Sequence, residues 1–269
     1  MVEASKARVA AVSSTTLYGR GVFTTLNIQQ ALPLLWPKHW TRLVEHAGKL
    51  NIDLKQTNEE LVSEALLKLL AVNKVDRGLA RVILLGRSGD EQWLKKLAPE
   101  NKTDLLIITF DPPRLHSEAL TLAVSPYRIT TFSPLLGVKS VNYLDRLLPW
   151  EEARKRDFDE AVVLNERGEI VSATMANIFW VKDGTVQTPS LSTGAVAGIT
   201  REAVIELATK LFIPVVEGVY EMGDLVDADE IFLTSSSLGL GIVTTFDFRQ
   251  YSVATGSIAS KLLKAFQAR

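Results

Sequence analysis

One lysine in a loop next to a glycine is the residue best suited to do chemistry in this sequence. Lys139 lies in the segment Gly137-Val138-Lys139-Ser140-Val141-Asn142-Tyr143, with apolar residues on both sides. An apolar setting disfavours the charged ammonium and favours the neutral amine that Schiff-base chemistry with a carbonyl compound requires. Ordinary surface lysines occur in similar segments, so this loop by itself leaves both interpretations open.

A second candidate is the segment Ala197-Gly198-Ile199-Thr200-Arg201, which opens an amphipathic stretch. Glycine allows the backbone to approach a ligand closely, and the N–H groups of a first helical turn attract phosphate. The hydroxyl of Thr200 could cap the helix or donate to a phosphate oxygen. A plain helix start has the same pattern, so the segment indicates a phosphate site without establishing one.

A third candidate combines histidine and arginine on one helical face. His39, Arg42 and His46 are separated by three and four residues, so they lie on the same side of a helix. They adjoin an apolar face predicted from offsets 0, 3, 4, 7 and 10, formed by Trp40, Leu43, Val44, Ala47 and Leu50. An arginine at the edge of a core favours a carboxylate or a phosphate, whereas a solvated arginine lies along its helix. The pattern fits either arrangement.

Two polar segments complete the candidates. Small and polar residues run from Ser172 to Asn177, directly before an apolar strand, and four hydroxyl residues follow one another from Thr234 to Ser237. Both segments could line a polar pocket, and both also fit ordinary turns.

The elements that must position these residues follow from hydrophobic spacing. Short apolar runs predict strands and longer amphipathic runs predict helices. The expected strands are 82–85, 105–110, 120–124, 161–164, 178–181 and 230–234, and the expected helices are 40–50, 58–72, 200–211 and the second half of 138–156. Strands and helices mix without strict alternation, which predicts a mixed α/β or α+β fold. The prolines after Asp111 predict a linker at 112–118 between a small domain, 1–111, and a larger cofactor-binding domain, 119–269.

Composition narrows the function. The chain has 269 residues, 46% of them hydrophobic, with a net charge of −1 and no cysteine. These numbers indicate a globular protein, exclude disulfides and thiolate chemistry, and give no basic surface for nucleic acid. Three histidines without metal-ligand spacing argue against a metal site. We expect no signal peptide, no membrane span and a cytoplasmic location.

In this order and spacing, the segments resemble the class IV aminotransferase family of pyridoxal-phosphate enzymes, also called fold type IV. The resemblance runs from Tyr18-Gly19-Arg20-Gly21-Val22-Phe23 to Glu230-Ile231-Phe232-Leu233-Thr234 and covers nearly the whole chain. It implies two α/β domains with the cofactor at the domain interface, a small-molecule substrate and a homodimer.

The resemblance also implies roles for individual residues. Lys139 corresponds to the lysine that binds pyridoxal 5'-phosphate covalently, and Arg42 to the arginine that holds the cofactor phosphate. The segment Gly198-Ile199-Thr200 corresponds to the phosphate cup, and Ser236 to a small hydroxyl residue near that phosphate. Asn177 matches the asparagine before the strand.

Within the family, the aminodeoxychorismate lyase subgroup is the most similar. Thr24 and Thr25 follow Phe23 where aminotransferases commonly have glutamate after the aromatic residue, and Trp180 ends the strand that begins at Asn177. The subgroup implies a lyase that makes 4-aminobenzoate and pyruvate for folate synthesis. Phe23, Thr25 and Tyr143 are then expected at the substrate. The asparagine three places after the lysine fits as well, although D-amino-acid aminotransferases share it.

One position departs from the family pattern. Five residues before Asn177, family members usually have a glutamate that pairs with the pyridine nitrogen of the cofactor, and here that residue is Ser172. A carboxylate keeps the nitrogen protonated and strengthens the electron sink, which a serine hydroxyl does less well. A D-amino-acid or branched-chain aminotransferase and a non-catalytic member of the fold are the alternatives to a lyase.

Overall fold

The structure is a computed structural model that describes residues 2, 6–87, 93, 96, 103–111, 119–251 and 256–268. The chain forms two compact units. The first comprises Met1–Pro112 with Val138–Tyr143, and the second comprises Pro113–Gly137 with Leu144–Arg269. The predicted linker at 112–118 lies outside the described residues. The lysine segment therefore belongs to the first unit, although it follows the start of the second unit in the chain.

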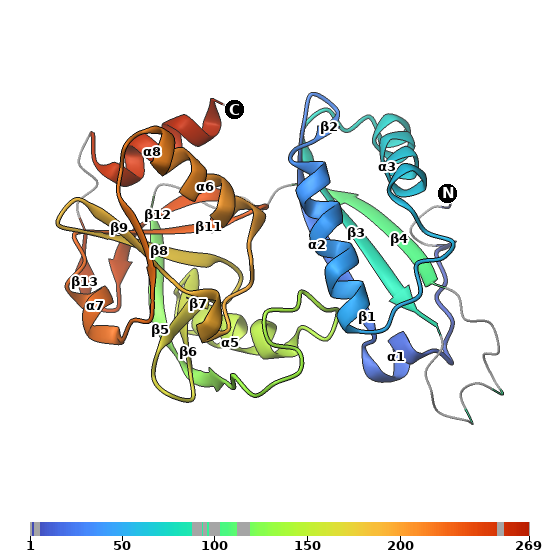
Figure 1. Cartoon of the computed structure of the whole chain (residues 1–269), viewed down its shortest axis with the longest axis horizontal. Helices are drawn as coiled ribbons and strands as arrows, with labels where there is room; N and C mark the ends of the chain where they lie inside the picture. Colours follow the sequence, from blue (N-terminus) through green and yellow to red (C-terminus); the bar gives the residue numbers. More distant parts are fainter. Residues whose placement is uncertain are drawn as a thin grey trace. The chain divides into compact units, whose positions relative to one another are not determined.

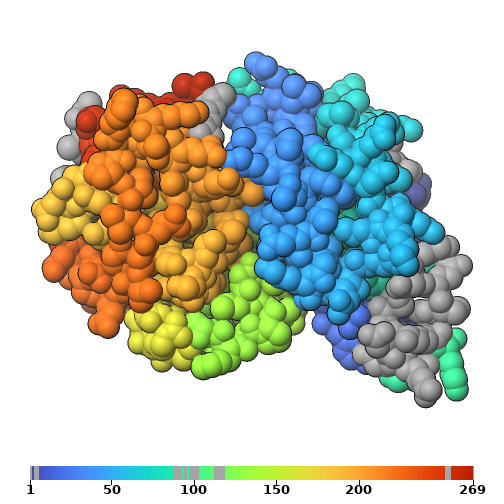
Figure 2. Space-filling model, in the orientation of Figure 1, coloured from blue at the N-terminus to red at the C-terminus, as the bar shows by residue number. Residues whose placement is uncertain are grey.

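The first unit is built on a four-stranded antiparallel sheet in the order β2-β1-β3-β4. Its strands are β1 (Gly21–Gln29), β2 (Leu32–Pro33), β3 (Gly78–Gly86) and β4 (Thr103–Phe110). Its helices are α1 (Ser14–Tyr18), α2 (Trp36–Lys49) and α3 (Glu59–Asn73). Figure 1 shows α2 running along the sheet, and Figure 2 shows its outer side at the surface of the unit. One hydrophobic core holds the sheet, α2 and α3 together.

Helix α2 forms where its spacing predicted, but its buried face differs in detail. Leu43 and Ala47 are buried as expected, together with the polar residues His39, Arg42 and His46. Val44, which was expected on the apolar face, is 38% exposed, so that assignment was wrong. The polar residues share the core face because their hydrogen-bond partners lie inside the unit. The spacing of apolar residues along the helix does not reveal such partners.

Helix α3 confirms the expected element with a different register. Asn58 caps it by accepting a hydrogen bond from the backbone N–H of Leu61 at 2.9 Å. The spacing in the sequence predicts a buried face of Leu61, Ala65, Leu66 and Leu69. Leu66 is buried as predicted, together with Val62 and Leu70, while Leu61 is 46% exposed. The buried residues follow an i, i+4 spacing that is shifted by one residue from the predicted face. A helix this rich in leucine has two apolar faces, and either could be buried.

The second unit is built on a nine-stranded mixed sheet. Its strand order is β10-β9-β8-β11-β12-β5-β6-β7, and β13 pairs with β12. The pairs β10–β9, β12–β5 and β5–β6 are parallel and the others are antiparallel. The strands are β5 (Leu120–Ile129), β6 (Glu160–Asn165), β7 (Ile170–Ala173), β8 (Asn177–Lys182), β9 (Thr185–Pro189), β10 (Val215–Gly218), β11 (Glu230–Ser235), β12 (Gly239–Phe246) and β13 (Arg249–Gln250).

Helices cover this sheet, and its buried strands explain the apolar runs of the sequence. The helices are α5 (Leu144–Lys155), α6 (Ile199–Lys210), α7 (Met222–Val226), α8 (Ile258–Gln267) and the short 3-10 helix η2 (Leu191–Thr193). Helices α6 and α8 share one core with β8, β11 and β12 (Figure 1). Strand β6 is buried along its whole length, as expected of a strand covered on both faces. Within the described residues, no helix has the length and apolar character needed to cross a membrane.

Candidate functional site

The backbone of the lysine segment pairs with the start of β1. The backbone N–H of Phe23 donates to the carbonyl of Lys139 at 3.1 Å, and the N–H of Val141 donates to the carbonyl of Gly21 at 2.9 Å. Val22 and Ser140 form the β-bridge between these two bonds. The lysine loop is thus fixed to the sheet by main-chain contacts that do not depend on its side chains.

The amine of Lys139 lies among aromatic rings. Its Nζ is 4.6 Å from the centre of the Phe23 ring and 5.1 Å from that of Tyr143. It also donates to the hydroxyl of Tyr143 at 3.3 Å. The two rings meet edge to face, with centroids 5.2 Å apart. This surrounding has the apolar character that the sequence predicted for Lys139, and it brings together the predicted residues Phe23, Lys139 and Tyr143.

Alternation along β1 separates two sets of side chains. Successive residues of a strand point to opposite faces, so Thr24 lies on the face toward α2, and Phe23 and Thr25 on the other. Arg81 is paired with Thr25 across β3 and shares that second face. The Nε of Arg81 donates to Thr25 Oγ1 at 3.2 Å, and its guanidinium lies 4.8 Å from the centre of the Phe23 ring. Two basic side chains, those of Lys139 and Arg81, therefore adjoin the same phenyl ring.

On the face toward α2, Arg42 is held by a chain of hydrogen bonds. Its Nη2 donates to Thr24 Oγ1 at 3.0 Å, and the same oxygen lies 2.6 Å from His39 Nδ1. A guanidinium only donates, so the hydroxyl of Thr24 accepts from Arg42. The direction of the hydrogen bond between Thr24 Oγ1 and His39 Nδ1 depends on the tautomer of His39. Burial lowers the pKa of Arg42 to about 10, so the group stays charged at neutral pH.

Both histidines of α2 are neutral near pH 7. Burial, with the nearby charge of Arg42, lowers the pKa of His39 to about 3 and that of His46 to about 4. The Nδ1 of His46 accepts the backbone N–H of Lys139 at 3.1 Å, which requires an unprotonated nitrogen. His46 thus connects helix α2 to the lysine segment. The sequence placed both histidines on the face of Arg42 without assigning them a function.

In the second unit, Asn177 begins β8 and adjoins the start of α6. Its Nδ2 donates to the carbonyl of Val196 at 2.9 Å. A Cβ atom on Gly198 would lie 2.1 Å from Asn177 Oδ1, so a larger residue there would displace the Asn177 side chain. Thr234, the cross-strand partner of Asn177 on β11, has a buried Oγ1 without a hydrogen-bond partner in the described part of the chain. An unpaired buried hydroxyl and a close backbone approach both fit a polar ligand.

Helix α6 begins at Ile199 without a side-chain cap from the described residues. Ile199 and Thr200 are buried in its first turn, whose N–H groups suit a phosphate. Arg201 fixes this turn to two strands, since its Nη2 donates to the carbonyl of Pro189 at 2.9 Å and to Glu217 Oε2 at 2.5 Å. Ser236 lies in the turn between β11 and β12 and is half-buried.

Ser172 lies on β7 and is buried. Its Oγ accepts a hydrogen bond from Arg146 Nη1 at 2.9 Å, and Arg146 is itself buried on α5. Sequence reasoning missed Arg146, because a single arginine in a helix of mixed polarity carries no periodic signal. It also missed Arg81, a single arginine within the otherwise apolar strand β3.

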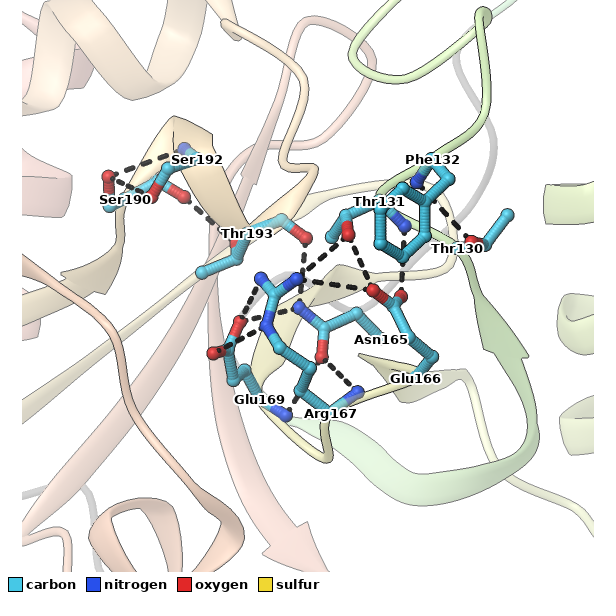
Figure 3. A network of polar contacts seen from close by, with 10 residues as sticks. All are labelled: Thr130, Thr131, Phe132, Asn165, Glu166, Arg167, Glu169, Ser190, Ser192 and Thr193. Carbon is cyan, nitrogen blue, oxygen red and sulfur yellow. Dashed lines mark hydrogen bonds and ion pairs between the residues drawn. The ribbon is translucent and has the colours of Figure 1, made fainter.

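A network of charged and polar side chains supports the hairpin of β6 and β7 that carries Ser172 (Figure 3). Arg167 donates from Nε and Nη2 to the two carboxylate oxygens of Glu169 at 2.8 and 2.6 Å, and from Nη1 to Thr131 Oγ1 at 2.8 Å. Asn165 reaches from the same turn to the carbonyl of Thr193 at 3.2 Å. These contacts connect the hairpin turn to the loop at Thr131 and to η2, which precedes the segment leading to Gly198.

The comparisons with known proteins agree with these features. The family model for class IV amino-transferases matches residues 21–246, which is most of the chain. The chain belongs to the class IV aminotransferase family. It is 32% identical to a putative branched-chain-amino-acid aminotransferase of Methanocaldococcus jannaschii, covering 99% of this chain and 92% of that protein. It is 30% identical to the aminodeoxychorismate lyase of Bacillus subtilis, covering 91% of this chain and 84% of that protein.

A similar solved structure confirms the fold. A putative 4-amino-4-deoxychorismate lyase from Legionella pneumophila superposes with a TM-score of 0.89 at 24% identity, covering 98% of this chain and 96% of that one. The expected mixed α/β fold of type IV is therefore confirmed. Among the residues that the structure describes, no group of three or more histidine, aspartate or glutamate side chains could hold a metal ion.

Proposed function

We propose that this class IV enzyme is a 4-amino-4-deoxychorismate lyase that uses pyridoxal 5'-phosphate to form 4-aminobenzoate and pyruvate. Membership of the family makes pyridoxal phosphate its cofactor. The observation that carries the lyase proposal is the contact of Ser172 with the buried cation Arg146, at the position where a glutamate is usual in the family.

The chemistry of the described groups fits this cofactor. Lys139 is proposed to bind it covalently, because its amine lies between two aromatic rings. Arg42 and the first-turn amides of Ile199 and Thr200 are proposed to hold the phosphate, because a charged guanidinium and helix N–H groups both favour a dianion. Ser172, at the position of the usual family glutamate, is proposed to contact the pyridine nitrogen, and Asn177 and Ser236 are proposed as further cofactor contacts.

When bound, pyridoxal phosphate supplies a carbonyl that combines with the substrate amine and a conjugated ring that accepts an electron pair from the neighbouring carbon. Lys139 would hold this group through its Nζ, and as a free neutral amine it would be a base. Lys139 Nζ would then take the proton from the carbon that bears the substrate amine. The C–O bond to the enolpyruvyl group breaks, the six-membered ring becomes aromatic, and the departing enolpyruvate takes up a proton to become pyruvate.

A cation near the aromatic residues suits the substrate of this reaction, which carries carboxylates. Arg81 is fixed by Thr25 and by the ring of Phe23, and it lies on the same sheet face as both. Phe23, Thr25 and Tyr143 are proposed to contact the ring of the substrate, with Arg81 as the partner of a carboxylate. A planar guanidinium favours this contact because it binds a carboxylate with two parallel hydrogen bonds.

A branched-chain or D-amino-acid aminotransferase is the alternative, and the relatives include branched-chain enzymes. Ser172 argues against it. Transamination stores charge in the pyridine ring and depends more on a protonated ring nitrogen, whereas aromatisation of the product drives the elimination. A non-catalytic member of the fold is a further alternative, against which Lys139 in its aromatic setting argues.

The first test is covalent trapping. Borohydride reduction of the purified protein followed by peptide mass mapping should find the cofactor on Lys139. Lys49, which forms an exposed ion pair with Glu45, is the internal control and should remain unmodified. An adduct on a different lysine, or none, would overturn the assignment of Lys139.

The second test separates lyase from aminotransferase. Loaded enzyme should release pyruvate and 4-aminobenzoate from aminodeoxychorismate faster than it transaminates common amino acids. Pyridoxamine phosphate should not accumulate when amino donors are added. The opposite ratio of rates would replace the lyase with an aminotransferase.

We extend the proposal to a homodimer in the cytoplasm that serves folate synthesis. Light scattering on the purified protein measures the mass directly, and twice 29.7 kDa is expected. Complementation of a strain that requires 4-aminobenzoate tests the pathway.

A further inference from the structure

The second unit contains a buried cation whose hydrogen-bond partner is a hydroxyl. Arg146 on α5 and Ser172 on β7 are 8% and 5% exposed, and the Arg146 Nη1 to Ser172 Oγ distance is 2.9 Å. Among the described residues, the carboxylate paired with Arg146 is that of Asp145, whose Oδ2 lies 4.0 Å from Arg146 Nε and whose side chain is 64% exposed. A solvated carboxylate at that distance screens the charge only weakly toward the interior.

The direction of this hydrogen bond is fixed by chemistry. A guanidinium has five N–H donors and no acceptor, so the oxygen of Ser172 must accept. The single hydroxyl hydrogen of Ser172 is not used in this bond, so Ser172 can donate it to a different atom. A carboxylate at the same position would act as an acceptor. Serine in place of glutamate therefore offers a hydrogen-bond donor where a carboxylate would offer an acceptor.

We infer that Arg146 and Ser172 together hold the pyridine nitrogen of the bound cofactor in its unprotonated form. The inference rests on the proposed function, which assigns Ser172 to that nitrogen. A hydroxyl that donates requires a nitrogen with a free lone pair, and a protonated nitrogen has none. The charge of Arg146 opposes a second positive charge in the same buried region. Both effects act in the same direction.

This pair makes Arg146 a positioning residue that sets the electron demand of the cofactor. An unprotonated ring withdraws electrons less strongly, so a reaction that must store charge in the ring is slowed. An elimination that ends in an aromatic product needs this storage least. Arg146 and Ser172 thus select between two reactions that begin with the same proton transfer to Lys139.

The test is nitrogen NMR of the holoenzyme loaded with cofactor that carries ¹⁵N in the pyridine ring. The wild-type signal should stay at the shift of unprotonated pyridine across the pH range in which the protein is folded. In Ser172→Glu the signal should move to the pyridinium shift. In Arg146→Met the midpoint of ring protonation should rise by roughly 1–3 pH units, because a nearby like charge is removed.

Two further variants separate charge from hydrogen bonding. Arg146→Lys keeps the charge and should keep the nitrogen unprotonated, and Ser172→Ala should do the same because Arg146 remains. Arg154→Met is the matched control, since Arg154 lies on the same helix, is half-exposed and pairs with Asp159 at 2.9 Å. It should leave the signal unchanged.

The outcomes distinguish this inference from the proposed function. A pyridinium signal in wild-type holoenzyme whose cofactor is trapped on Lys139 overturns the inference and leaves the cofactor assignment intact. Failure to load or trap the cofactor overturns both. Because the wild-type spectrum alone decides between the two forms of the nitrogen, the test stands even if a variant fails to fold.

Discussion

Arg42 in the first unit and Arg167 in the second hold their charge in opposite ways. Arg42 is buried, donates to the hydroxyl of Thr24, and has its pKa lowered to about 10 by burial. Arg167 lies at the surface with both oxygens of Glu169 against it, and the hydrogen bond to Glu169 raises its pKa (Figure 3). The first arrangement costs solvation energy, and the second neutralises the charge where water also reaches it.

The difference separates charged groups that stabilise the fold from charged groups that belong to the candidate site. The arginine at the hairpin turn is paired with carboxylates and holds the neighbouring loop in place. Charges around Phe23 and on α2 contact hydroxyls, aromatic rings and neutral histidines. A cation in such surroundings can attract an anion. Groups with perturbed pKa values therefore point to functional sites.

The largest effect is expected from Lys139→Ala. Removing the proposed base and covalent anchor should lower kcat by roughly 10²–10⁴-fold or more, because general base catalysis alone contributes that range. Steady-state rates at saturating cofactor measure it. Lys49→Ala is the control and should keep the wild-type rate. A variant of Lys139 with near-normal turnover would remove the lysine from the mechanism.

The second largest effect is expected from Arg42→Ala, with Arg167→Ala for comparison. Arg42→Ala should weaken cofactor binding by roughly one to two orders of magnitude, because a charge-assisted contact to a phosphate contributes about 1.5–3 kcal/mol. Arg167→Ala should leave cofactor affinity unchanged. Fluorescence titration of the apoprotein with pyridoxal phosphate measures both. Titration with pyridoxal, which has no phosphate, should show no difference between wild type and Arg42→Ala.

Acid should destabilise the protein through the histidines of α2. The pKa values of His39 and His46 are lowered to about 3 and about 4, while the unfolded chain keeps ordinary values near 6.5. The unfolded state therefore binds more protons below pH 6.5, and stability falls as the pH falls toward 4. His39 alone accounts for on the order of 3 kcal/mol of this loss. Urea unfolding at several pH values measures the slope.

Replacement of either histidine by asparagine should flatten that slope. His46→Asn keeps an acceptor for the backbone N–H of Lys139 and should retain the fold at pH 7. If stability between pH 7 and pH 4 is the same in both variants as in wild type, the histidines are not the groups that titrate.

The smallest expected effect concerns Glu160. It should lower the stability of the protein as the pH rises, whereas the histidines lower it as the pH falls. Burial raises its pKa to about 7, although the hydroxyl of Thr174 and the backbone N–H of Met175 donate to it. The folded state then binds more protons than the unfolded state between pH 4.5 and 7, so stability falls as the pH rises through this window. Glu160→Gln should remove on the order of 1–3 kcal/mol of that dependence.

Urea unfolding at pH 5 and pH 7 measures this change as well. Glu45→Gln is the control, because its hydrogen bond to Lys49 lowers the pKa of Glu45 and keeps it ionised throughout the window. A slope that persists in Glu160→Gln would assign the dependence to a different group.

Much of the fold could be predicted from the sequence because it depends on local patterns. The strands at 82–85, 161–164 and 178–181 are continuous apolar runs, and they lie within β3, β6 and β8. Asn58 and the amphipathic run after Gly198 predicted the starts of α3 and α6. Errors arose at Leu61, where two faces of the helix are similarly apolar, and at Val44, where buried polar side chains share the core face of α2. In both helices the packing partners decide which face is buried.

The sequence by itself determined the chemical types of the candidate site: a lysine in an apolar loop, an arginine with two histidines on one helix face, and a glycine before a helix. Only the tertiary structure decided the partners. Arg42 on α2 contacts Thr24 on β1 because the helix packs on the sheet, and Arg146 reaches Ser172 across 26 positions of the chain. Such contacts depend on which elements pack together, and the free energy of packing is a property of surfaces that are distant in sequence.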